Sequence, residues 1–158
     1  RGLEADPATD GPLYTWIDAN GGFESEAVGA FMLSTIPLIQ ERIKTLEEYA
    51  PLTRAFFLDD VSGFSQEEMV PKKRSAGEVE DMLRGVIGEL KTLDEWTTER
   101  IEETLRRLCT EYEWKPRELF QPIRVAVTGS KISPPLFETM ELLGQETSVG
   151  RLAGAVEV

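Results

Sequence analysis

The chain has 158 residues, with 29 Asp and Glu against 17 Lys and Arg, one cysteine and no histidine, so its formal net charge is −12. This length allows one domain or two small ones. The absence of histidine excludes a Ser-His-Asp triad, a histidine proton shuttle and a histidine metal site. Lone Cys109 excludes an internal disulfide and a cysteine-only zinc site, so we expect no bound metal.

The acidity argues against non-specific binding to DNA or to anionic membranes, and no apolar run is long enough to span a bilayer. The charge is uneven, because residues 1–30 hold six acids and one base while residues 114–137 hold four bases and one acid. The chain begins with Arg1 and shows no secretory leader. We therefore expect a cytoplasmic piece of a longer protein, with a leftover residue before a complete small protein as the alternative.

Apolar residues recur at spacings of three and four along the first part of the chain, which predicts helices. One such run covers residues 24–49, and Pro37 should kink it or split it into two helices. A shorter amphipathic stretch covers residues 52–58. Residues 59–74 are polar and turn-forming, which indicates a connection between two helical units. We interpret its basic run, residues 72–74, as a solvated linker, with a phosphate contact as the alternative.

The second part begins with a capping box, in which Glu78 follows Ser75 at three residues, and an amphipathic helix follows. Asp94 or Thr97 should cap the next helix, whose apolar face is expected to run from Trp96 through Cys109 to Tyr112. An inert, buried thiol is the expected state of Cys109.

Three further helices are expected. Pro116 suits the start of a helix over residues 117–127 that ends at Gly129, although residues 124–128 could form a strand instead. The next helix covers residues 136–143, with Gly144 after it, and the last covers residues 148–156. The fold is therefore predicted to be all-α, with two small helical bundles. Their expected bounds are residues 1–72, whose N-terminal residues are partly linker, and residues 73–158.

Few residues suggest catalysis. The sequence Thr-Gly-Ser-Lys at 128–131 matches the end of a phosphate-binding loop, but Arg124 stands where the first glycine of that loop belongs. Carboxylate pairs such as Glu102-Glu103 lie in charged stretches that would not raise a pKa for acid–base work. An independent enzyme is therefore not expected.

The sequence QPIRVAVTGSKISPPLFE at residues 121–138, followed by LLGQE at 142–146 and RL at 151–152, resembles the C-terminal anticodon-binding region of bacterial glutamyl-tRNA synthetases, which are class I aminoacyl-tRNA synthetases. Weaker matches are EWT at 95–97 and RIKTL at 42–46. Together they extend over roughly residues 10–156. One departure is Pro135, where some family members have glycine.

The resemblance implies an α-helical cage of two small bundles that binds the anticodon stem-loop of tRNA(Glu), as a monomer. The family's histidine-containing catalytic motif does not occur, so the chain alone should be inactive. The ATP-dependent attachment of glutamate, with its ATP and Mg²⁺, would belong to the absent catalytic part of the parent ligase. No cofactor is expected here. An acidic helical module that binds a protein and no RNA is the alternative.

The resemblance also implies site residues. Arg42 would read the third anticodon base, which is cytosine for glutamate and guanine for glutamine; a guanidinium can donate to cytosine N3 and O2, whereas guanine presents donors there. An arginine on a helix surface, paired with Glu41 and Glu47, is the alternative. Contacts to the other two bases would come from five residues: Gln121, Arg124, Ser133, Pro134 and Leu136. Arg117 and Lys131 are candidates for phosphate contacts. Helix-capping or core roles are the alternatives for several of these residues.

Overall fold

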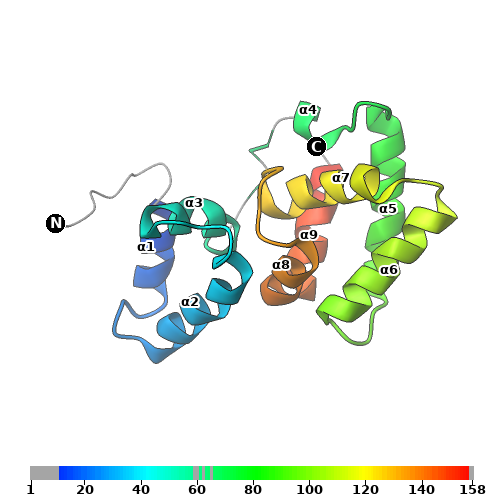
Figure 1. The fold of residues 1–158 in the computed structure, drawn as a ribbon. Helices are drawn as coiled ribbons and strands as arrows, with labels where there is room; N and C mark the ends of the chain where they lie inside the picture. The colour runs from blue at the N-terminus through cyan, green and yellow to red at the C-terminus, as the bar shows by residue number, and fades with distance from the viewer. Residues whose placement is uncertain (1–10, 59–60, 62, 65, 157–158) are drawn as a thin grey trace. The chain divides into compact units, whose positions relative to one another are not determined.

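The computed structural model describes residues 11–58, 61, 63, 64 and 66–156, and within them the regular elements are all helices, with no strand. The all-α prediction is confirmed. Contacts divide the chain into two compact units, Arg1–Asp59 and Asp60–Val158 (Figure 1). This division falls before the expected boundary at residues 72 and 73, so the described residues of the connection that follow Asp60 belong to the second unit.

The first unit contains five short elements: α1 (Gly11–Ala19), α2 (Glu26–Ile39), the 3₁₀ turn η1 (Leu46–Glu48), α3 (Tyr49–Thr53) and the 3₁₀ turn η2 (Arg54–Phe56). Aromatic rings form much of its core. The Trp16 ring lies 4.9 Å from that of Phe31 and 5.2 Å from that of Phe57. Fully buried Ile17 and Ile39 lie on α1 and α2.

The long helical run is split into separate elements, which is one of the two outcomes that the sequence allowed, and the break comes two residues after Pro37, which lies inside α2. α2 ends at Ile39, and residues 40–45 form turns and bends instead of helix. The chain becomes helical again where Glu48 accepts hydrogen bonds from the backbone N–H groups of Lys44 and Thr45. These two bonds lower the pKa of the Glu48 carboxyl.

The second unit contains α4 (Gln66–Met69), α5 (Ala76–Lys91), α6 (Thr98–Glu111), α7 (Pro116–Thr128), α8 (Leu136–Leu143) and α9 (Gln145–Val156). α9 packs against α5 and α7, and α8 packs against α6 (Figure 1). The core between them consists of side chains with 1% exposure or less: Leu83, Val86, Leu90, Ile101, Leu105, Leu108, Leu119, Ile123, Val125, Ala126, Val127, Met140 and Leu152. Burial of this aliphatic set is the main term that stabilises the unit.

Most helix ends in this unit follow the sequence signals. The Ser75 hydroxyl accepts from the backbone N–H of Glu78, whose carboxylate accepts from that of Ser75, so the capping box is confirmed. Thr97 is the N-cap of α6, and Gly129 and Gly144 follow α7 and α8. The alternative of a strand at residues 124–128 is wrong, because these residues are helical.

Three features differ from the sequence analysis. Trp96 lies before α6 rather than on its face, and its indole N–H donates to the Met140 carbonyl at 2.8 Å. α9 begins at Gln145, earlier than expected, and the short α4 was not anticipated. Arg74 is not a solvated linker residue: its guanidinium donates to the Glu118 carboxylate at 3.1 Å.

No described helix combines the length and the apolar composition needed to cross a membrane.

Candidate nucleic-acid interface

The end of α7 and the loop that follows it form a fixed cluster around Arg124. Its guanidinium donates to the Ser133 hydroxyl and, at 3.0 Å, to the Pro134 carbonyl. The Ser133 hydroxyl in turn donates to the same carbonyl at 2.8 Å. Ser133 is only 3% exposed, so these bonds lie largely out of water, where a missing partner would be costly. The structure thus brings three of the predicted residues together.

The start of this loop is constrained by Gly129, whose φ of 76° lies in the left-handed region. A Cβ at this position would lie 3.0 Å from the Val61 carbonyl oxygen, so glycine also permits a close approach of two backbones. The Thr128 hydroxyl donates to the Arg124 carbonyl at 2.7 Å and accepts from the Ser130 N–H. With Pro134 at its other end, the loop has little conformational freedom.

The tip of the loop points two side chains into solvent. Lys131 is exposed, and Ile132 is 78% exposed, so an aliphatic surface stands beside a cation. Arg117 is also exposed, in the first turn of α7. Sequence reasoning missed Ile132. The sequence signal that could have identified it is a β-branched aliphatic residue in the segment before Pro134, which has no helical spacing of apolar residues.

Two predicted residues have structural partners. Gln121 is half-buried and donates from its side-chain amide to the Glu68 carbonyl at 2.7 Å, which ties α4 to α7. Leu136 is 3% exposed and belongs to the core at the start of α8. Their contacts with bases stay predictions, and the exposed aliphatic side chain of this region is that of Ile132.

Arg42 lies in the first unit, in the turn that follows α2, and is exposed. Its backbone N–H donates to the Ile39 carbonyl at 2.8 Å. The alternative for Arg42, ion pairs with Glu41 and Glu47 on a helix surface, requires a helix at this position. Residues 40–45 are not helical, so that helix is absent. The turn places the Arg42 side chain at the surface of its own unit.

The chemistry available here is binding. The groups supply positive charge, hydrogen-bond donors and an aliphatic surface, and the described residues bring together no group of three possible metal ligands. Cys109 is buried, and its burial raises the pKa of the thiol, which disfavours the reactive thiolate.

A family model described as "Anticodon binding domain" matches residues 14–156. The match extends over nearly all of the described residues, so the chain belongs to the anticodon-binding domain family.

Particular relatives are glutamate–tRNA ligases. The one from Chloroflexus aurantiacus is 40% identical over 134 residues, which are 84% of this chain and 27% of the relative. The one from Roseiflexus castenholzii is 40% identical over 129 residues, which are 82% of this chain and 25% of the relative. A similar solved structure is the crystal structure of a glutamate tRNA ligase from Elizabethkingia meningosepticum in complex with its amino acid. It matches with a TM-score of 0.72 and 20% sequence identity, over 96% of this chain and 29% of that chain. This likeness supports the fold. The chain therefore spans about a quarter of these relatives' length, and the predicted resemblance is confirmed.

Proposed function

We propose that the chain is the anticodon-binding part of a glutamate–tRNA ligase and that it binds the anticodon loop of tRNA(Glu). The observation that carries this proposal is the loop between α7 and α8. There Arg124 bonds to Ser133 and Pro134, and the tip presents a cation beside exposed Ile132. Single-stranded RNA loops are bound by such sets of groups, since bases stack on flat or apolar surfaces and phosphates pair with cations.

The cluster around Arg124 supports a role for the loop as a rigid platform. Base recognition needs donors and acceptors that are held in place before binding, because ordering them afterwards costs affinity. The Ser133 hydroxyl and the Pro134 carbonyl are already bonded to one guanidinium. A base that approaches the loop would therefore meet groups that need little rearrangement. Gln121, one turn before Arg124, would give up its bond to Glu68 to contact a base.

For the third anticodon base, we propose that Arg42 distinguishes cytosine from guanine. An exposed guanidinium can donate to cytosine N3 and O2 together, whereas guanine offers donors at that edge. A mismatch of this kind costs about 1–3 kcal/mol, which is about 5- to 150-fold in affinity.

Glutamate attachment itself would belong to the catalytic part of the ligase, acting in the cytoplasm. The described residues do not fit a Mg²⁺ site, because they bring together no group of three His, Cys, Asp or Glu side chains that could hold a metal ion. We therefore assign ATP and Mg²⁺ to that catalytic part. The net charge of −12 predicts that the isolated chain, as a monomer, binds tRNA weakly and with strong salt dependence.

The alternative of an acidic module that binds a protein and no RNA is not favoured, because the family match supports RNA recognition.

Fluorescence anisotropy with labelled RNA hairpins tests the proposal. The probes are the anticodon stem-loop of tRNA(Glu) and the same stem closed by an unrelated loop, each at two salt concentrations. We expect the tRNA(Glu) loop to bind several-fold more tightly, and Lys131→Ala to weaken both probes while leaving their ratio unchanged. Equal binding of the two hairpins would contradict loop recognition, and binding of neither would reject the proposal for the isolated chain.

A further inference from the structure

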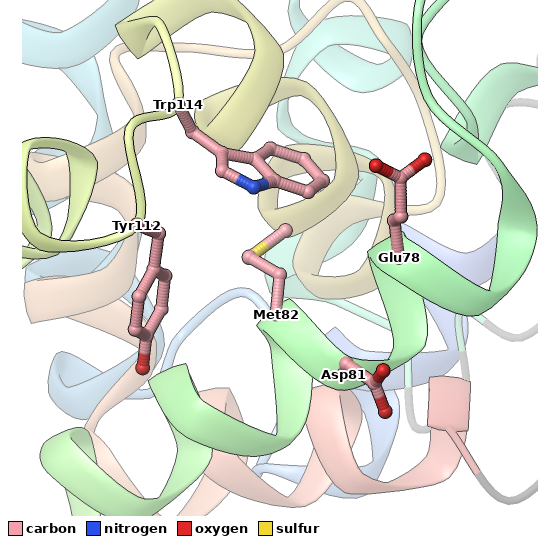
Figure 2. Close-up of a pocket in the computed structure, with 5 residues that line it drawn as sticks. All are labelled: Glu78, Asp81, Met82, Tyr112 and Trp114. Atoms are coloured by element: carbon pink, nitrogen blue, oxygen red, sulfur yellow. The ribbon is translucent and has the colours of Figure 1, made fainter.

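A pocket of about 330 Å³ lies between the start of α5 and the turn that follows α6 (Figure 2). Five residues line it: Glu78, Asp81, Met82, Tyr112 and Trp114. Trp114 precedes the start of α7, whereas Arg124 and its loop lie toward the other end of that helix. From Pro116 to Arg124 the helix rises about 12 Å, and the loop follows only after Thr128, so this pocket is separate from the anticodon loop site.

The walls of the pocket are held by the end of α6. Glu113 adopts a φ of 57°, and the Trp114 N–H donates to the Cys109 carbonyl at 2.9 Å, as in a Schellman ending. The Tyr112 ring lies against Gly85 of α5, where an added Cβ would come within 2.2 Å of the phenol oxygen. Trp114 is 8% exposed. The two aromatic walls are therefore formed before any ligand arrives.

One cation already occupies this environment. The Arg74 guanidinium carbon lies 4.1 Å from the centre of the Trp114 ring, and its nitrogens lie 3.6 Å from the Glu78 carboxylate and 3.1 Å from that of Glu118. An aromatic face flanked by carboxylates attracts a cation electrostatically. The Arg74 guanidinium thus shows which kind of group, a cation, the Trp114 ring and the neighbouring carboxylates bind.

The pocket side retains groups without partners among the described residues. The Trp114 indole N–H makes no hydrogen bond there, and Figure 2 shows its nitrogen on the edge that faces Met82 and Tyr112. The structure records no ion pair or hydrogen bond for the Asp81 carboxylate within the same residues. A complementary ligand therefore carries a positive charge for the Asp81 carboxylate and an acceptor for the indole N–H. Glu78 and Asp81 would repel a phosphate.

We infer that this pocket binds a lysine or arginine side chain of a partner polypeptide. The cationic end would lie by Asp81, and the carbonyl of the same peptide would accept from the Trp114 indole. The volume is at the lower end for small-molecule sites, so it suits one side chain rather than a cofactor. The net charge of −12 favours the approach of a basic segment. This binding is independent of the anticodon loop and needs no RNA.

NMR on the ¹⁵N-labelled 158-residue chain tests the inference. The probes are blocked Gly-Lys-Gly, Gly-Arg-Gly, Gly-norleucine-Gly and Gly-Glu-Gly tripeptides, and the readout is the indole N–H resonance of Trp114. Trp96 is an internal control, because its indole N–H is already bonded to the Met140 carbonyl. We expect the two basic peptides to shift Trp114 in a saturable manner, with little effect on Trp96.

Asp81→Asn should weaken the lysine and arginine peptides about 2- to 5-fold, the effect of losing one exposed ion pair. Asp94→Asn is the matched control, because Asp94 is an exposed acid outside the pocket, and it should leave binding unchanged. The inference would be overturned by equal shifts with the norleucine or glutamate peptide, by equal weakening in both variants, or by no saturable shift of Trp114. Stronger shifts with adenosine or guanosine monophosphate would instead assign the pocket to a nucleotide.

Discussion

Replacing Arg124 with methionine tests whether the α7–α8 loop is held by one guanidinium. Methionine keeps most of the aliphatic stem and removes the donors to Ser133 and Pro134. Hydrogen bonds from a charged donor contribute about 1.5–3 kcal/mol each. The Ser133 hydroxyl still donates to the Pro134 carbonyl after the change, so neither oxygen loses every partner. We therefore expect a loss of about 1–3 kcal/mol in the free energy of unfolding, less than the sum of two bonds.

The assay must report on the second unit alone, because two units need not unfold in one transition. A Trp16→Phe background leaves Trp96 and Trp114 as the only tryptophans, and both lie in the second unit. Urea unfolding is then followed by tryptophan fluorescence. Arg117→Met is the control, because Arg117 is exposed on the same helix. If Arg124→Met and Arg117→Met lowered stability equally, the guanidinium would not hold the loop.

Three further changes have defined outcomes. Glu113→Gly should raise the free energy of unfolding by about 1 kcal/mol, because glycine relieves the cost of a φ of 57°; a lower urea midpoint would contradict this. Thr139→Val should also stabilise by about 1 kcal/mol, because its buried hydroxyl has no partner among the described residues, and thermal unfolding that shows a loss would mean that a partner exists. The hydrogen bond from Arg74 lowers the pKa of Glu118 in the folded state below the ordinary carboxyl pKa of 4.5. The ionised carboxylate therefore stabilises the fold at pH values above 4.5. This contribution is lost as the pH falls from 4.5 through the lowered pKa of the folded state. Glu118→Gln should therefore make stability less dependent on pH in that acidic range, and an unchanged slope in urea unfolding would refute the assignment.

Local signals predicted the helices of the second unit well. Capping residues such as Ser75 and Thr97, and the glycines after α7 and α8, fixed helix ends that tertiary contacts did not override. The strand alternative at residues 124–128 was wrong. Only the β-branched content of these residues favoured a strand, whereas Pro116 and Gly129 mark the start and the end of a helix.

The remaining features depend on contacts between residues far apart in sequence. Trp96 has an aromatic side chain at helical spacing from α6, but it precedes the N-cap Thr97, and its indole N–H instead donates to the Met140 carbonyl, 44 residues away. Arg74 lies in a polar run, yet Glu118 and Trp114, 44 and 40 residues further along the chain, give it two partners that no local pattern contains. The exposure of Ile132 follows from how the Arg124 cluster closes the loop. Hydrophobicity and spacing carry no information on such pairings.

The most direct test of anticodon recognition compares two RNAs that differ in one base. The 158-residue chain is titrated with tRNA(Glu) and with the same tRNA carrying guanine as its third anticodon base, at low and near-physiological salt. Arg42→Lys is the matched variant, because it keeps the charge and loses the planar fork. The account predicts a preference of about 5- to 150-fold for cytosine. That preference should disappear in Arg42→Lys while the salt dependence remains. Equal affinity of the unaltered chain for both tRNAs, or a preference that survives in Arg42→Lys, would contradict it.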